Sequence, residues 1–105
     1  MNILKCLKER NVVKEIQNLS AEKARLEFTK IRSYFSYKNE IDVLIKKDFK
    51  IENIPVRYYR GRNKSENDIL PIMIYSHGGG WVLGSTDTHD QVCSTLVNKG
   101  QYDLI

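Results

Sequence analysis

Apolar residues recur every three or four positions through the first third of the chain, the spacing of one face of an α-helix. Ile3 and Leu7 share such a face, and the spacing continues to Leu19. A second helix is predicted after Ser20, because a serine hydroxyl is suited to capping a helix N-terminus. Its apolar positions form one stripe: Ala24, Phe28, Ile31 and Phe35. The stripe predicts either ordinary packing or a lid-like face lying over another part of the molecule.

The period changes after residue 40, where β-branched residues become frequent. Residues 41–51 predict a strand, Glu52 and Asn53 offer a turn, and residues 56–60 predict a second strand. Pro55 lies where a strand can begin without giving up a ladder hydrogen bond. The two strands therefore predict a hairpin.

Residues 69–75 are apolar at nearly every position, which is typical of a strand covered on both faces in an α/β sheet. A helix is predicted from Thr86 or Thr88 to a stop at Gly100. Its inward positions are expected to be Val92, Cys93 and Leu96. Residues 102–105 resemble the opening of another strand. The order predicts an α/β fold, with a helical, cap-like segment at 1–40 and an α/β core at 41–105.

The composition of the 105 residues, 41% hydrophobic and 29% charged, fits one small globular domain or part of a larger one. The net charge of +4 comes from scattered lysines and arginines with no basic run of five, so we expect a solvated basic surface and no nucleic-acid partner. Cys6 and Cys93 belong to no metal-ligand pattern and predict free thiols in a reducing cytoplasm. No signal peptide and no membrane-spanning segment is predicted.

Three consecutive glycines follow His77 at the end of the third apolar run, and the cluster needs an explanation. A phosphate-binding loop is excluded because Ser85 stands where its lysine belongs, and a dinucleotide loop because Leu83 replaces the last glycine. A metal site is disfavoured because no third ligand at a recognisable spacing joins His77 and His89. We therefore expect no metal and no cofactor. A flexible strand-to-helix turn stays open as the simplest alternative.

A buried strand followed by His-Gly-Gly-Gly-Trp and then Gly84-Ser85 resembles the N-terminal part of the hormone-sensitive-lipase-like esterases, the α/β-hydrolase fold-3 family. The resemblance covers most of residues 20–100 and is most specific at 70–90. It implies that Gly79 and Gly80 donate backbone N–H groups to the oxyanion of ester hydrolysis. It further implies that His77 braces the loop through hydrogen bonds and that Trp81 lines the substrate pocket. The implied substrate is a small acyl ester.

The family's nucleophile lies in a G-x-S-x-G turn, and in this fold the acid and the histidine of the triad follow it in the chain. None of the seven serines has glycine two residues away on both sides. His89 and Asp90 cannot replace the triad without a nucleophile to activate. The expectation is a truncated ester hydrolase that is inactive alone.

The fold resemblance also implies that the fourth strand lies between the second and the third. The strand at 69–75 would then have nothing on its other side. The alternative function is a non-catalytic interaction module that pairs through this exposed strand, with a complementing C-terminal fragment as its expected partner.

Overall fold

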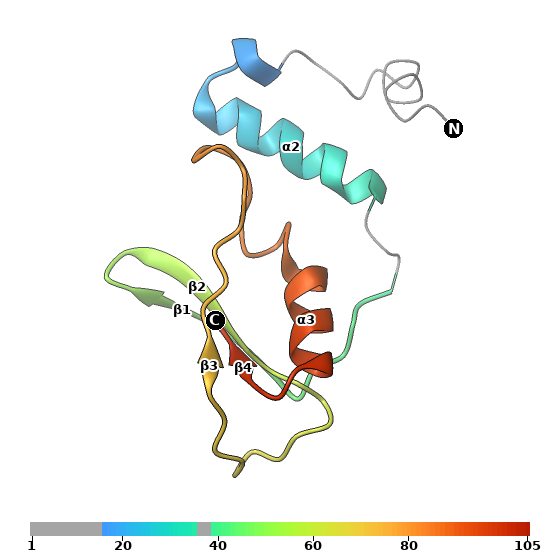
Figure 1. Ribbon diagram of the computed structural model, residues 1–105. Coiled ribbons are helices and arrows are strands. Elements are labelled where there is room, and N and C mark those ends of the chain that lie inside the picture. The colour runs from blue at the N-terminus through green and yellow to red at the C-terminus, as the bar shows by residue number, and fades with distance from the viewer. Residues whose placement is uncertain (1–15, 36–38) are drawn as a thin grey trace. The chain divides into compact units, whose positions relative to one another are not determined.

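The computed structural model describes residues 16–35 and 39–105, and Figure 1 shows its elements. A 3₁₀-helix, η1, spans Ile16–Asn18 and is followed by α2, Ala21–Phe35. The strands are β1, Ile45–Ile51, β2, Ile54–Arg60, β3, Ile72–Met73, and β4, Asp103–Leu104. Helix α3, Asp90–Lys99, precedes β4. The helix predicted before residue 16 lies outside the described residues, as do Cys6 and its thiol.

Two compact units make up the described chain. The first joins η1 and α2 to the loop 78–84, and the second contains the sheet and α3. Each unit therefore combines segments that are distant in sequence. The predicted division at residue 40 into a cap-like segment and a core stays a prediction.

Helix α2 begins as its sequence predicts. The Ser20 carbonyl accepts a hydrogen bond from the Ala24 N–H at 2.8 Å, and the Ser20 hydroxyl accepts one from the Lys23 N–H at 3.5 Å. The first contact is the opening intrahelical bond, and the second satisfies an N–H group that a helix start leaves without an intrahelical partner. The predicted N-cap at Ser20 is confirmed.

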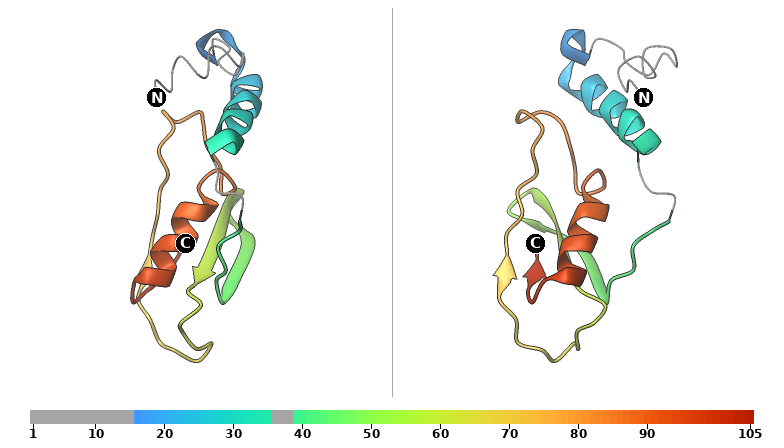
Figure 2. Two further views of the ribbon diagram at one scale, coloured as in Figure 1. Left: turned by 90° about the vertical axis from the view of Figure 1, so that its right-hand side faces the viewer. Right: turned by 45° about the vertical axis from the view of Figure 1, so that its right-hand side comes forward.

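The sheet of the second unit has the strand order β1-β2-β4-β3. The antiparallel pair of β1 and β2 is the predicted hairpin, with Glu52 at a positive φ of 51° in its turn. Strand β4 pairs antiparallel with β2 and parallel with β3, so the fourth strand lies between the second and the third, as predicted. Figure 2 shows β3 and β4 side by side.

The prediction that residues 69–75 form a strand covered on both faces is wrong in two respects. The strand itself spans only Ile72–Met73. Met73 and Tyr75 pack against the core, but Ile69, Ile72 and Ile74 are 99%, 60% and 81% exposed. Neighbouring side chains along an extended strand point to opposite faces, and in this chain only one face of the segment is covered.

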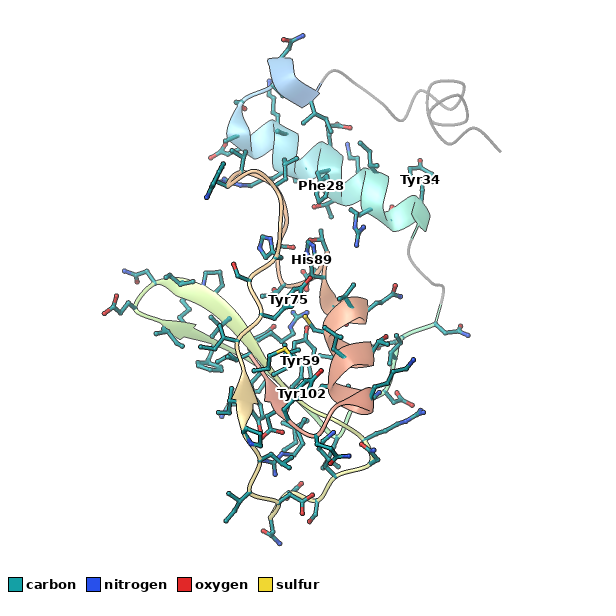
Figure 3. The ribbon with its side chains drawn as sticks, viewed as in Figure 1. Phe28, Tyr34, Tyr59, Tyr75, His89 and Tyr102 are labelled. Carbon is teal, nitrogen blue, oxygen red and sulfur yellow. The ribbon has the colours of Figure 1, made fainter. Side chains whose placement is uncertain are left out.

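The core of the second unit lies between α3 and the sheet, around Tyr59, Cys93, Val97 and Leu104 (Figure 3). Helix α3 faces it with Asp90, Cys93, Ser94 and Val97, which recur at helical spacing. Cys93 is a buried free thiol. Leu96 is partly buried against the core as predicted, but Val92 is 40% exposed, so its predicted inward position is wrong.

The rotation of α3 is set by a charged residue, which an apolar pattern does not report. The Asp90 carboxylate accepts hydrogen bonds from Lys46 at 2.9 Å, from Arg57 at 3.1 Å and from the Tyr59 hydroxyl at 2.8 Å. These bonds hold the face that contains Asp90 against the sheet, and Val92 lies two residues away on the helix surface.

Helix α3 ends at Gly100, where the helix was predicted to stop. The Gly100 N–H donates to the Leu96 carbonyl at 2.9 Å. Its φ of −87° is ordinary for any residue, so the left-handed cap typical of glycine is not used here. A Cβ at this position would instead collide with the ring of Tyr102. A larger residue at this position would require that ring to move.

Candidate oxyanion site

The loop 78–84 carries the glycine cluster, and its backbone is largely left-handed. The φ angles are 146° at Gly79, 60° at Gly80, 62° at Trp81 and 97° at Gly84. Residues with a Cβ rarely adopt positive φ angles, and glycine accordingly occupies three of these four positions. Trp81 adopts it without that freedom, and such strained residues concentrate at functional sites.

Two hydrogen bonds close the loop on the Gly79 carbonyl. The N–H of Leu83 donates to this oxygen at 2.9 Å, and the N–H of Val82 donates at 3.2 Å. A Cβ at Gly79 would collide with the Leu83 carbonyl, whereas one at Gly78 or Gly80 would meet nothing within 4 Å. Gly79 is therefore required by both its dihedral angle and its neighbour, whereas Gly80 is favoured only by its dihedral angle, which Trp81 also adopts.

The N–H groups of Gly79 and Gly80 stay without a hydrogen-bond acceptor among residues 16–35 and 39–105. Both glycines line a groove of about 770 Å³. Backbone N–H groups are strong donors that folded proteins normally satisfy. Two adjacent residues that line a groove, and whose N–H groups have no acceptor within the described ranges, are suited to binding an anionic or carbonyl oxygen of a ligand.

The remainder of the groove is apolar. Helix α2, which carries Phe28 (labelled in Figure 3), contributes the stripe predicted from the sequence, and η1 and the loop itself add further side chains. The lining side chains, apart from the two glycines, are Ile16, Leu19, Ala21, Ala24, Phe28, Ile31, Val82 and Leu83. The stripe therefore lines the same groove as the glycine loop, and its lid-like role stays a prediction. The side chain of Phe35, the last member of the predicted stripe, is not among those that the structure describes.

An arginine that the sequence did not single out ties α2 to the loop. The Arg25 Nε donates to the Val82 carbonyl at 2.8 Å, across 57 residues of sequence. No local pattern marks Arg25, because its partner is a backbone carbonyl, which any residue supplies. Only the folded arrangement reveals the contact.

The predicted roles of His77 and Trp81 stay predictions. The His77 ring stacks on the His89 ring with centroids 4.8 Å apart and planes 16° apart. The Nδ1 of His89 lies 3.0 Å from the Thr88 hydroxyl. Trp81 is fully exposed and is not among the side chains that line the groove.

After the loop, Ser85 and Thr88 lead the chain into α3 through reciprocal contacts. The Ser85 N–H donates to the Thr88 hydroxyl at 2.8 Å, and the Thr88 N–H donates to the Ser85 hydroxyl at 3.3 Å. Ser85 thus serves a turn, which agrees with the exclusion of a phosphate-binding loop.

A second hollow, of about 360 Å³, lies on the sheet unit and is lined by charged side chains. Within it Arg57 pairs with Asp48, Asp87 and Asp90, and Lys46 pairs with Asp90 and Glu40. Burial alone would raise the pKa of Asp90, but hydrogen bonds from Lys46 and Tyr59 outweigh it and hold this pKa below the usual range. Asp90 is therefore a charged structural anchor.

Over the described ranges no group of three or more histidine, cysteine, aspartate or glutamate side chains could hold a metal ion. No helix of those ranges has both the length and the apolar character that a bilayer crossing needs.

A strand that leads into a glycine loop, followed by a helix and a parallel strand, is the arrangement expected of the oxyanion loop in α/β hydrolases. Comparisons with known proteins agree. The family described as alpha/beta hydrolase fold matches residues 73–105. Carboxylesterase NlhH of Mycobacterium tuberculosis is 50% identical over 42 residues, covering 40% of this chain and 12% of the relative. Protein R526 of Acanthamoeba polyphaga mimivirus is 33% identical over 92 residues, covering 88% and 26%.

Solved structures extend the similarity to nearly all of the chain. The esterase of Pyrobaculum calidifontis superposes with a TM-score of 0.73 at 26% identity, over 99% of this chain and 34% of that one. Esterase rPPE superposes with a TM-score of 0.75 at 27% identity, over 96% and 31%. The chain is therefore similar to the α/β-hydrolase fold-3 family of hormone-sensitive-lipase-like esterases. It spans about a third of the length of these solved esterases, and a smaller share of the length of the two curated relatives, 26% and 12%.

Proposed function

We propose that this chain supplies the oxyanion-binding part of a carboxylic-ester hydrolase. The observation that carries the proposal is that Gly79 and Gly80 line an apolar groove and that their N–H groups have no acceptor among the described residues. In ester hydrolysis the carbonyl oxygen becomes an oxyanion, and donors aimed at it lower the barrier. The loss of one such donor costs about 2.7–4 kcal/mol of transition-state stabilisation.

The groove supports an acyl ester as the substrate class. Its eight non-glycine lining side chains are all apolar, and Gly79 and Gly80 complete the lining. An ester carbonyl bound at the two N–H groups would leave its hydrocarbon portion to contact Phe28, Ile31 and Leu19. Apolar contact of this kind stabilises binding by roughly 25 cal/mol for each Å² removed from water.

The 105 residues contain no G-x-S-x-G turn, so the proposal assigns them binding of the oxyanion and not nucleophilic attack. The chain is expected to show no turnover of short p-nitrophenyl esters above a Gly79→Asp control. Clear hydrolysis that depends on Gly79 would demonstrate a nucleophile within these residues and contradict the assignment.

Binding is tested directly by titrating the ¹⁵N-labelled chain with hexanoate, whose carboxylate resembles the oxyanion in charge. The amide signals of Gly79 and Gly80 should move in a saturable manner, with smaller movements at Phe28 and Ile31. Hexylammonium, which has the same chain and the opposite charge, is the matched control and should leave the two glycine signals in place. Glycine signals that ignore hexanoate, or respond equally to both compounds, would contradict the proposal.

A second candidate function rests on the edge of the sheet. Among the described residues, strand β3 pairs only with β4, and Ile72 in the strand and Ile74 just after it are exposed. An unpaired edge flanked by apolar side chains is suited to the addition of a partner strand. Sedimentation of the chain tests this candidate: self-association that Ile72→Lys or Ile74→Lys abolishes would favour it, and a monomer at all concentrations would count against it. The cytoplasmic location and the complementing fragment stay proposals as well.

A further inference from the structure

The orientation of the Gly80 N–H is fixed by what lies on the other side of its own peptide. In a trans peptide the C=O and the N–H point in opposite directions across a rigid plane. The Gly79 carbonyl belongs to the same plane as the Gly80 N–H, and it accepts hydrogen bonds from Leu83 and Val82. The Gly80 N–H is therefore directed away from those donors.

The peptide between Val82 and Leu83 is held in the same manner, one step further from the groove. Its N–H donates to the Gly79 carbonyl at 2.9 Å, and its carbonyl accepts from the Arg25 Nε at 2.8 Å. The two contacts lie on opposite edges of one peptide plane. A rotation of that plane would break both, so the Arg25 contact helps to fix the Leu83 N–H on the Gly79 oxygen.

The result is a relay of hydrogen bonds that runs from a guanidinium through two peptides to the Gly80 N–H. Hydrogen bonds in such a chain polarise one another, and a charged donor strengthens the first link. A cation at one end draws electron density along each carbonyl and makes the N–H at the other end a stronger donor.

We propose that Arg25 is a positioning residue for the oxyanion site and that, through the Val82–Leu83 and Gly79–Gly80 peptides, it orients and polarises the Gly80 N–H. The inference rests on the proposed function, because it assigns Arg25 a role in that same loop. It concerns a contact between α2 and the loop within one compact unit.

The test compares three variants of the 105-residue chain. Arg25→Met keeps the side-chain length and the helix propensity but removes the donor and the charge. Arg25→Lys retains the charge. Lys23→Met removes a charge from an exposed position of the same helix and serves as the matched control. The readouts are the amide proton shift of Gly80 and the hydrogen-exchange rate of the Leu83 amide, both without ligand.

In Arg25→Met we expect the Gly80 proton to move upfield and the Leu83 amide to exchange about tenfold faster, because a hydrogen bond from a charged donor is lost. Arg25→Lys should recover part of both changes, and Lys23→Met should show neither. A Gly80 proton and a Leu83 exchange rate that match wild type in Arg25→Met would overturn the inference. Protection of the Phe28 amide from hydrogen exchange shows whether α2 is intact in each variant. If Arg25→Met loses this protection, the Gly80 proton shift and the Leu83 exchange rate are compared between Arg25→Lys and Lys23→Met instead.

Hexanoate separates this inference from the proposed function. If hexanoate moves neither glycine signal in wild type while Arg25→Met still alters the Gly80 proton, the oxyanion function fails and the relay stands. If hexanoate binds wild type and Arg25→Met equally, and the Gly80 proton is unchanged, the relay fails and the oxyanion site stands. When both hold, Arg25→Met should weaken hexanoate binding and Lys23→Met should not.

Discussion

The glycine loop and the inner strand β4 differ in whether their polar groups have hydrogen-bond partners. At β4, Asp103 is 3% exposed, and its carboxylate accepts from Arg60 at 2.9 and 2.6 Å and from the Tyr58 hydroxyl at 2.8 Å. In the loop, two adjacent N–H groups have no described acceptor, and Trp81 holds a left-handed φ. Buried polar groups without partners are costly, so a scaffold satisfies them. The proposed oxyanion site would account for both the open donors and the backbone strain of the loop.

The largest effect on hexanoate binding is expected from a side chain added at Gly79, where the loop has no room for a Cβ. Gly79→Ala would place a Cβ against the Leu83 carbonyl and force the residue out of its φ of 146°. The hydrogen bonds onto the Gly79 oxygen should break, and the hexanoate-induced shifts should disappear. Gly78→Ala meets no atom within 4 Å and should bind hexanoate within about twofold of wild type. If Gly79→Ala and Gly78→Ala bound hexanoate equally well, the conformation of Gly79 would not matter for binding, and the comparison of loop and scaffold would fail.

The scaffold should fail differently, by losing stability. Asp103→Asn removes the charge that faces Arg60 and leaves the guanidinium without its counter-ion. Breaking a buried pair from one side is strongly destabilising, and we expect the midpoint of thermal unfolding to fall by on the order of 10 °C. Circular dichroism melting measures it. Asp68→Asn, which alters an exposed loop aspartate, is the control, and a fall of equal size there would contradict the role of Asp103.

The same carboxylate predicts a dependence of stability on pH. Hydrogen bonds from Arg60 hold the pKa of Asp103 below its usual range, and burial only partly opposes them. A pKa depressed by folding contributes stability above the unfolded value of about 3.9 and loses it as pH falls toward the folded value. The free energy of unfolding of wild type should therefore drop more steeply below about pH 4 than that of Asp103→Asn. Parallel curves would contradict this assignment.

The smallest effect concerns the apolar wall of the groove. Phe28 lines it, whereas Leu26 on the same helix is 64% exposed and does not. Phe28→Ala should weaken hexanoate binding about fivefold, because roughly 40 Å² less apolar area is buried at ~25 cal/mol per Å². Leu26→Ala should leave the affinity unchanged. A loss of affinity only in Leu26→Ala would place the hydrocarbon chain outside the groove.

Local signals in the sequence predicted much of the scaffold. The hairpin, the Ser20 cap and the stop at Gly100 are set by short-range patterns, and all were correct. The inward face of α3 was predicted only in part, because the carboxylate of Asp90 determines its rotation through partners on other strands. The coverage of residues 69–75 depends on neighbours that an apolar run does not identify.

The candidate site likewise has some residues that the sequence predicted and one that it did not. Gly79 and Gly80 were identified from the His-Gly-Gly-Gly-Trp pattern, because unusual dihedral angles require glycine and leave a signature in the sequence. The apolar stripe of α2 was found and lines the groove beside the loop, whereas its lid-like role stays a prediction. Arg25 was missed, since an arginine on an exposed helix position has no pattern that distinguishes it from its neighbours. Long-range contacts to backbone atoms have to be seen in the structure.

The central claim is that the N–H groups of Gly79 and Gly80 bind the oxygen that becomes negatively charged during acyl cleavage. Crystals of the chain with hexanoate measure it most directly, through the distances from the carboxylate oxygens to the two backbone nitrogens. We expect one oxygen within about 2.7–3.1 Å of both nitrogens, with the hydrocarbon chain against Phe28. A carboxylate bound elsewhere, or glycine nitrogens bonded to protein atoms with the groove empty of ligand, would contradict the claim.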